Sequence, residues 1–190
     1  GAVQVMSGMI NPFFRRLFPG LPQDSPAHGS IMMNLAANML GLDNAATPMG
    51  LKAMQQMQEV NTRKDAASNA QIMFLVLNTS GLTIVPVSIM VYRAQLGAAN
   101  PTDIFIPILL ATYFSTLAGL IAVAIYQKIN LFDRVILAYL GGISALMAGV
   151  IWYFSTLDKE AVTVVSNVAS NIILFGIIMV FIGMAAWKRI

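Results

Sequence analysis

The chain has 190 residues, of which 57% are hydrophobic and only 10% are charged. A soluble domain is usually about 45–50% apolar and about 25% charged, so this composition excludes an ordinary soluble domain and indicates an integral membrane protein. The net charge of +3 comes without a dense basic run, which argues against nucleic-acid binding, and the absence of cysteine excludes disulfides and thiolate metal sites.

Residues 1–25 are predicted to form a segment at the membrane interface. Phenylalanine side chains stand beside Arg15 and Arg16, and both residue types favour the boundary between hydrocarbon and headgroups. Three prolines exclude a long helix over the second half of the segment. A plain polar loop is the alternative, and the sequence favours the interfacial interpretation.

Residues 26–60 are predicted to form a helical hairpin. Its first apolar run, 26–42, is too short to cross a hydrocarbon core of ~30 Å, which needs about 20 residues. Thr47 followed by Pro48 has the pattern of a helix start, with a hydroxyl N-cap and proline at the first helical position. We therefore expect the second helix to begin at Pro48, after a polar interruption.

Spanning helices are predicted after the hairpin near 67–92, 103–127, 132–156 and 166–187. Pro86 lies inside the first of them and has no N–H, so the carbonyl of Leu82 loses its helix partner. This span is expected to be kinked or locally unwound there. Small residues allow close helix packing, and the candidates are Gly119, Gly141, Gly142, Gly176 and Gly183.

The basic residues predict the orientation in the membrane. With four spans, seven basic residues lie on one side and two on the other, which favours cytoplasmic loops at 52–66 and 127–134 and a cytoplasmic C-terminus. A re-entrant hairpin adds Arg15 and Arg16 to the majority, giving nine against two, whereas a crossing hairpin gives seven against four. The charges favour the re-entrant form. The seven are Lys52, Arg63, Lys64, Lys128, Arg134, Lys188 and Arg189, and the two are Arg93 and Lys159.

Polar side chains gather beside the two predicted helix breaks. Broken backbone at membrane depth is tolerated only inside protein or beside a water-filled cavity, and a helix start adds free N–H groups with partial positive charge. Asn34 and Asn38, four residues apart, share one helix face. Together these groups predict a polar-ligand site of the kind that discontinuous helices form in transporters. The candidate binding residues are Asn34, Asn38, Asn44, Thr47, Asn78, Thr79 and Ser80.

The same residues also have a purely structural interpretation, which the sequence leaves open. Asn44 and Thr47 can cap a helix, and the other amides can form interhelical hydrogen bonds worth about 1 kcal/mol each. Asp43 is a candidate for binding a coupling ion, although helix capping or an indirect role is favoured. Nothing in the sequence resembles a catalytic triad, a paired-carboxylate site, a metal motif or a phosphate loop, so we expect no enzyme, metal or cofactor.

The stretches "NAATPMGLKAM" and "LNTSGLTIVP" resemble spore maturation protein A and its relatives, and the resemblance covers residues 11–126. These proteins carry a membrane domain called the nucleoside-recognition or Gate domain, named for its similarity to part of the concentrative nucleoside transporters. The resemblance implies a Gate-like membrane domain over 26–126, with broken helices that carry a polar-ligand site. It also implies a multi-pass protein of the bacterial inner membrane, but not that the family moves nucleosides.

The chain departs from the family pattern in three ways. Family members usually begin with further apolar helices, so we expect a fragment. Asp43 stands where glycine is common, in the form "GLGNAATP". Residues 127–190 run beyond the shorter members and look like the start of a connection into a spore maturation protein B-like half, which is fused on in some bacteria.

These observations predict an all-α polytopic helical bundle, with one re-entrant broken-helix hairpin and about four transmembrane helices. The expected function is a transporter or solute-recognition subunit for a small polar solute, nucleoside-like by the resemblance. The alternative is a structural or assembly subunit that pairs with a spore maturation protein B-like half or subunit, without solute transport. The expected partners are the lipid bilayer, the solute, the B-like part and further copies of the chain, and no nucleic acid.

Overall fold

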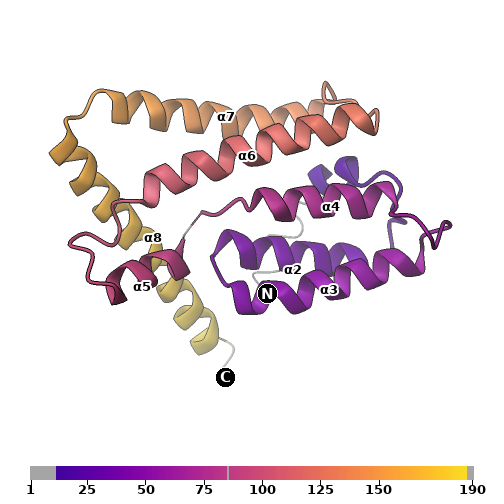
Figure 1. Cartoon of the computed structure of the whole chain (residues 1–190), viewed down its shortest axis with the longest axis horizontal. Coiled ribbons are helices and arrows are strands. Elements are labelled where there is room, and N and C mark those ends of the chain that lie inside the picture. The colour runs from indigo at the N-terminus through magenta and orange to yellow at the C-terminus, as the bar shows by residue number, and fades with distance from the viewer. Residues whose placement is uncertain (1–11, 85, 188–190) are drawn as a thin grey trace.

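The computed structural model describes residues 12–84 and 86–187, and every regular element within them is helical (Figure 1). The predicted all-α class is therefore confirmed. A short helical stretch over residues 12–17 comes first. The following helices are α2 (Ala27–Met39), α3 (Asp43–Glu59), α4 (Asn69–Ser80), α5 (Val87–Gln95), α6 (Phe105–Tyr126), α7 (Arg134–Ser155) and α8 (Lys159–Trp187).

Helices α2 and α3 form the predicted helical hairpin and lie side by side (Figure 1). Gly41 makes the turn with φ of 64°, a left-handed conformation that glycine adopts without steric cost. The N–H of Gly41 donates to the Asn38 carbonyl, and the N–H of Leu42 donates to the Ala37 carbonyl at 2.9 Å, which closes the end of α2. The two helices have 13 and 17 residues, both short of the ~20 that cross a bilayer.

The predicted start of the second hairpin helix is wrong. α3 begins at Asp43, so Thr47 and Pro48 lie inside the helix and do not form its N-cap and first position. The new helix starts directly after the glycine turn. The Leu42 carbonyl already accepts hydrogen bonds from the N–H groups of Ala45 and Ala46, at 2.9 and 3.0 Å. Pro48 has no N–H, so the carbonyl of Asn44 loses its helix partner within the first turns of α3.

The predicted span over 67–92 is not one continuous helix. α4 ends at Ser80 and is capped by Gly81, which has φ of 61°, and α5 starts after Pro86. The unwound stretch between the two helices confirms the break that the proline predicted. At its other end, α4 begins with a capping box, in which Ser68 and Gln71 bond each other's backbone N–H groups.

Two helices in the described residues, α6 and α7, are long and apolar enough to cross a membrane. They match the spans predicted near 103–127 and 132–156. Helix α8 covers the predicted span 166–187 and begins earlier, at Lys159. The two apolar helices are consistent with a membrane protein, and the total of four spans stays a prediction.

The core lies where the N-terminal segment meets the hairpin, α4, α6 and α7. Leu17 and Phe18 are each only 1% exposed and pack in one cluster with Phe74 and Ile136. The segment predicted to be interfacial therefore contributes apolar side chains to the core. Its arginines remain exposed, as an interfacial position requires.

Close packing through glycine is confirmed at Gly119. A Cβ at this position would lie 2.8 Å from Cγ1 of Val76, so α4 and α6 approach each other here only because the side chain is missing. The other glycines predicted to pack closely have open space where a Cβ would stand, namely Gly141, Gly142, Gly176 and Gly183.

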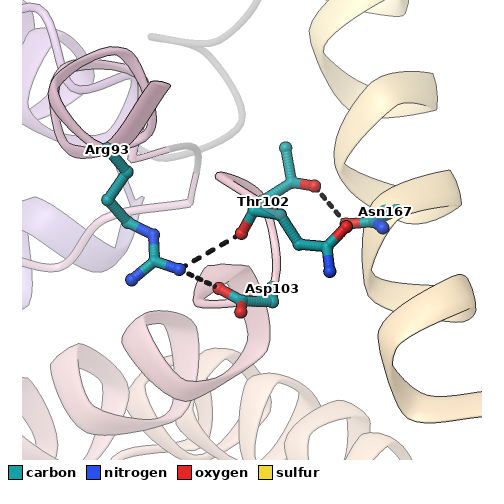
Figure 2. Close-up of polar contacts among 5 residues, drawn as sticks. Arg93, Thr102, Asp103 and Asn167 are labelled. Carbon is teal, nitrogen blue, oxygen red and sulfur yellow. Dashed lines mark hydrogen bonds and ion pairs between the residues drawn. The ribbon is translucent and has the colours of Figure 1, made fainter. Parts of the chain in front are cut away.

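Polar contacts tie the α5–α6 connection together and join it to α8 (Figure 2). Nη2 of Arg93 donates to Oδ1 of Asp103 at 2.7 Å and to the Asn100 carbonyl at 3.1 Å. The Thr102 hydroxyl donates to the side-chain oxygen of Asn167 on α8. These contacts fix the end of α6 that lies opposite the α6–α7 connection.

Candidate functional site

The turn of the hairpin and the break between α4 and α5 lie against each other. The N–H of Ile84 donates to the Met39 carbonyl at 2.8 Å, and the Ser88 hydroxyl donates to the Gly41 carbonyl at 2.9 Å. Backbone groups that have no helix partner at one break thus form hydrogen bonds with groups at the other break. The two breaks, separate in the sequence, form one place in the fold.

A chain of three asparagines links three helices beside this place. Nδ2 of Asn34, on α2, donates to the Ala46 carbonyl of α3 at 2.8 Å, and Asn34 is only 3% exposed. Nδ2 of Asn38 donates to Oδ1 of Asn34 at 3.4 Å and to Oδ1 of Asn78, on α4, at 2.8 Å. Nδ2 of Asn78 donates to the Phe74 carbonyl at 2.9 Å. The neutral amides therefore cross-link α2, α3 and α4.

Gly50 allows Asn34 to reach α3. A Cβ at Gly50 would lie 2.8 Å from Nδ2 of Asn34, so any larger residue would push the amide away from the Ala46 carbonyl. Sequence reasoning missed this residue. The available signal was a glycine in the interior of a helix, where it costs about 1 kcal/mol relative to alanine and needs a reason.

A cavity of about 370 Å³ opens between α2, α3 and α4, next to the asparagine chain. No lining residue carries a charge, and the polar groups sit among apolar walls, as is usual in small-molecule sites. Such a cavity suits an uncharged solute that can both donate and accept hydrogen bonds. Its lining consists of Asn34, Asn38, Ala46, Thr47, Gly50, Leu51, Met54, Phe74, Leu75 and Asn78.

The structure brings four of the seven predicted binding residues to this cavity, namely Asn34, Asn38, Thr47 and Asn78. The other three lie elsewhere. Asn44 is exposed at the start of α3, outside the lining. The hydroxyls of Thr79 and Ser80 donate to carbonyls of their own helix, those of Leu75 at 2.8 Å and Leu77 at 2.9 Å.

The binding role of all seven residues stays a prediction. The side chain of Asp43 lies outside what the structure describes, so its part in binding an ion also stays a prediction. The asparagines behave as the structural interpretation predicts, since they cross-link helices. They also behave as the site interpretation predicts, since three of them border one cavity.

Comparison with known proteins gives one informative relative. Spore maturation protein A from Bacillus subtilis (strain 168) is 44% identical to the chain over 121 residues. The chain is a relative of spore maturation protein A. The predicted resemblance to this family is therefore confirmed. The match covers 64% of the chain and 62% of spore maturation protein A, so the chain spans less than two thirds of that relative. No family model and no solved structure matches the chain.

Proposed function

We propose that the chain is the solute-recognition part of a membrane transport protein and that it binds a small, uncharged, polar solute between α2, α3 and α4. The asparagine chain carries this proposal. It places amide groups from two helices at the edge of an uncharged cavity, beside two interrupted helices. Each amide has donors and an acceptor, and those not used within the asparagine chain can match a solute with a mixed hydrogen-bonding edge.

A nucleoside-like solute has the matching chemistry, and the family resemblance points to the same class. Its base is uncharged and carries donors and acceptors along one edge, while its flat faces suit apolar walls such as Phe74 and Met54. The relative's own name gives spore maturation as the process in which that protein acts.

The proposal includes a re-entrant hairpin in the bacterial inner membrane. Nη1 of Arg16 forms an ion pair with Oδ2 of Asp133 at 2.9 Å, beside the α6–α7 connection. Nε2 of Gln127 donates to the Asn69 carbonyl at 2.8 Å, so the start of α4 lies at this same end. These contacts bring Arg16 and the start of α4 to the end of the fold where Lys128 and Arg134 lie, which supports an arrangement with these basic residues on one side, and that side is then the cytoplasmic one.

Assembly with a spore maturation protein B-like half or subunit is the second candidate function. Two observations favour it. The asparagines already bond one another and backbone carbonyls, as they would if their task were to lock helices. The hairpin also exposes large apolar side chains, among them Leu51 at 68%. A partner subunit would cover such side chains.

A thermal-shift screen of the purified protein in detergent, with uridine, adenosine and their bases, tests the first proposal. A solute at 100 times its Kd should add about 2.7 kcal/mol to the free energy of unfolding. We expect a rise in Tm with a nucleoside for the wild type, and no rise for Asn78→Ala. Asn44→Ala should respond like the wild type, because Asn44 lies outside the cavity lining.

The control is Thr79→Val, which removes a hydroxyl that bonds only within α4 among the contacts described. It should keep the full response. A folded wild type that no nucleoside or base stabilises would overturn solute recognition. Co-purification with a spore maturation protein B-like partner, lost in Asn78→Ala, would then establish the assembly role.

A further inference from the structure

Two backbone carbonyls fix the direction of all three amides in the asparagine chain. Nδ2 of Asn34 faces the Ala46 carbonyl at 2.8 Å. Nδ2 of Asn78 faces the Phe74 carbonyl at 2.9 Å. A carbonyl only accepts, so the facing atom is the nitrogen in both side chains, and their Oδ1 atoms are the ones that meet Asn38. Asn38 must present Nδ2 to both oxygens, at 3.4 and 2.8 Å, because two facing oxygens would repel each other.

This direction leaves one acceptor and one donor unused on two neighbouring side chains. Both hydrogens on Nδ2 of Asn38 are donated, whereas its Oδ1 accepts no hydrogen bond from any group in the described part of the chain. Nδ2 of Asn78 donates one hydrogen to the Phe74 carbonyl and keeps a second. Asn38 and Asn78 therefore offer a carbonyl oxygen and an N–H side by side.

A solute in the cavity can reach these two side chains. Within the described residues, the buried side-chain N and O atoms without a partner are Nε of Arg93 and Oγ1 of Thr116. Oδ1 of Asn38 is not one of them, so this unpaired oxygen has accessible surface. Asn38 and Asn78 are both half-buried and both line the cavity between α2, α3 and α4. Asn34 is only 3% exposed, so its main contribution is to hold the amide of Asn38 in place.

We propose that Asn38 and Asn78 together bind a solute edge on which an N–H stands beside an acceptor. Oδ1 of Asn38 accepts from the N–H of the solute, and Nδ2 of Asn78 donates to the neighbouring oxygen or nitrogen. In uracil these groups are the N–H at position 3 and a carbonyl next to it. Proteins that bind an unpaired base form hydrogen bonds to this same edge. Asn34 is a positioning residue that acts through Asn38.

This inference rests on the solute recognition proposed above, and it adds which atoms of the protein bind the base. Uridine and 3-methyluridine test it in the wild-type chain, because the methyl group replaces the N–H that the base uses. We expect isothermal titration calorimetry of the full chain in detergent to show about tenfold weaker binding of 3-methyluridine, which leaves Oδ1 of Asn38 unpaired. The control ligand is 5-methyluridine, which carries its added methyl group away from this edge and should bind like uridine.

Adenosine and N6,N6-dimethyladenosine provide the same comparison for a purine, since the two methyl groups remove both N–H donors of the adenine amino group. The dimethyl form should again bind about tenfold more weakly. The nucleoside that binds more tightly to the wild type then serves for the comparison of variants.

Asn38→Ala shows whether Asn38 receives the N–H. The variant should weaken the binding of uridine by about tenfold and leave that of 3-methyluridine nearly unchanged, because the analogue has no N–H to donate. A residue with a purely structural role would affect both ligands equally. Asn38→Leu keeps the approximate shape of the side chain and replaces the alanine variant if that variant fails to fold. Asn44→Ala removes an amide outside the cavity lining and should keep the tenfold preference.

Three results would overturn the assignment, and they separate it from the proposed function. Equal binding of each nucleoside and its methylated form by the wild type would leave solute recognition standing without this role of Asn38 and Asn78. Equal weakening of both ligands by the Asn38 variants would give Asn38 a structural role only. A folded wild type that binds no nucleoside would overturn the assignment and the proposed function together.

Discussion

Asn34 of α2 packs directly against Gly50 of α3 within the hairpin. The amide of Asn34 is buried and bonds the Ala46 carbonyl, and the missing side chain of Gly50 leaves the space in which it lies. A buried amide that loses its acceptor costs about 1–3 kcal/mol, more than alanine gains over glycine in a helix. The steric effect should therefore outweigh helix propensity at this position.

Gly50→Ala tests this balance. We expect it to lower the free energy of unfolding by about 1–2 kcal/mol, measured as a fall in Tm in detergent. Gly29→Ala is the matched control on the facing helix, because a Cβ there would meet nothing within 4 Å. The control should be neutral or stabilising by up to about 1 kcal/mol. A stabilised Gly50→Ala would mean that Asn34 does not hold the hairpin together.

At the scale of elements, α4 and α6 owe their close approach to Gly119. The Cβ of an alanine would lie 2.8 Å from Cγ1 of Val76, and overpacking of this kind costs about 1–3 kcal/mol. We expect Gly119→Ala to lower Tm and the second change Val76→Ala to restore part of the loss. The cycle of single and double variants should therefore show a favourable coupling. Gly149→Ala, which has open space around it, serves as the control.

The link between the two helix breaks also belongs to this scale. The Ser88 hydroxyl bonds the Gly41 carbonyl across 47 residues of sequence. Ser88→Ala should lower the free energy of unfolding by about 0.5–1.5 kcal/mol, the usual net value of such a bond. Ser155→Ala removes an exposed hydroxyl that bonds its own helix, at the Trp152 carbonyl, and should change Tm little. Equal effects of the two changes would show that the link contributes nothing.

At the scale of the whole molecule, the ion pair between Arg16 and Asp133 places the N-terminal segment beside the α6–α7 connection. A hairpin that crossed the membrane would put these two residues on opposite sides. The contact and the positive-inside rule therefore favour the same re-entrant arrangement.

Single-cysteine labelling can test this topology, because the chain has no cysteine of its own. We expect Arg15→Cys, Lys64→Cys and Lys128→Cys to react with an impermeant maleimide from the cytoplasmic side. Gln95→Cys, exposed at the end of α5, should react from the opposite side. Labelling of Arg15→Cys together with Gln95→Cys would instead show that the hairpin crosses the membrane.

Much of the fold follows from the sequence alone, because the features concerned are local. Apolar runs and charge content predicted helices in a membrane, and Pro86 predicted the break, since proline removes a bond that spans only four residues. The spacing of Asn34 and Asn38 placed both amides on one helix face. Thr47 and Pro48 misled the prediction, because a local start pattern competed with a turn that had already begun α3.

Only the tertiary structure decided which polar groups meet. Asn38 bonds Asn78 across 40 residues of sequence, and no local pattern specifies that register. The residues at the cavity share their side-chain chemistry with Asn44, Thr79 and Ser80. These three lie at helix positions outside the cavity lining, and Thr79 and Ser80 bond carbonyls of their own helix. The sequence by itself predicted a membrane protein with interrupted helices and with amide side chains close to the breaks. The packing of α2, α3 and α4 decided the site, because hydrogen bonds form between groups that folding brings within reach of one another.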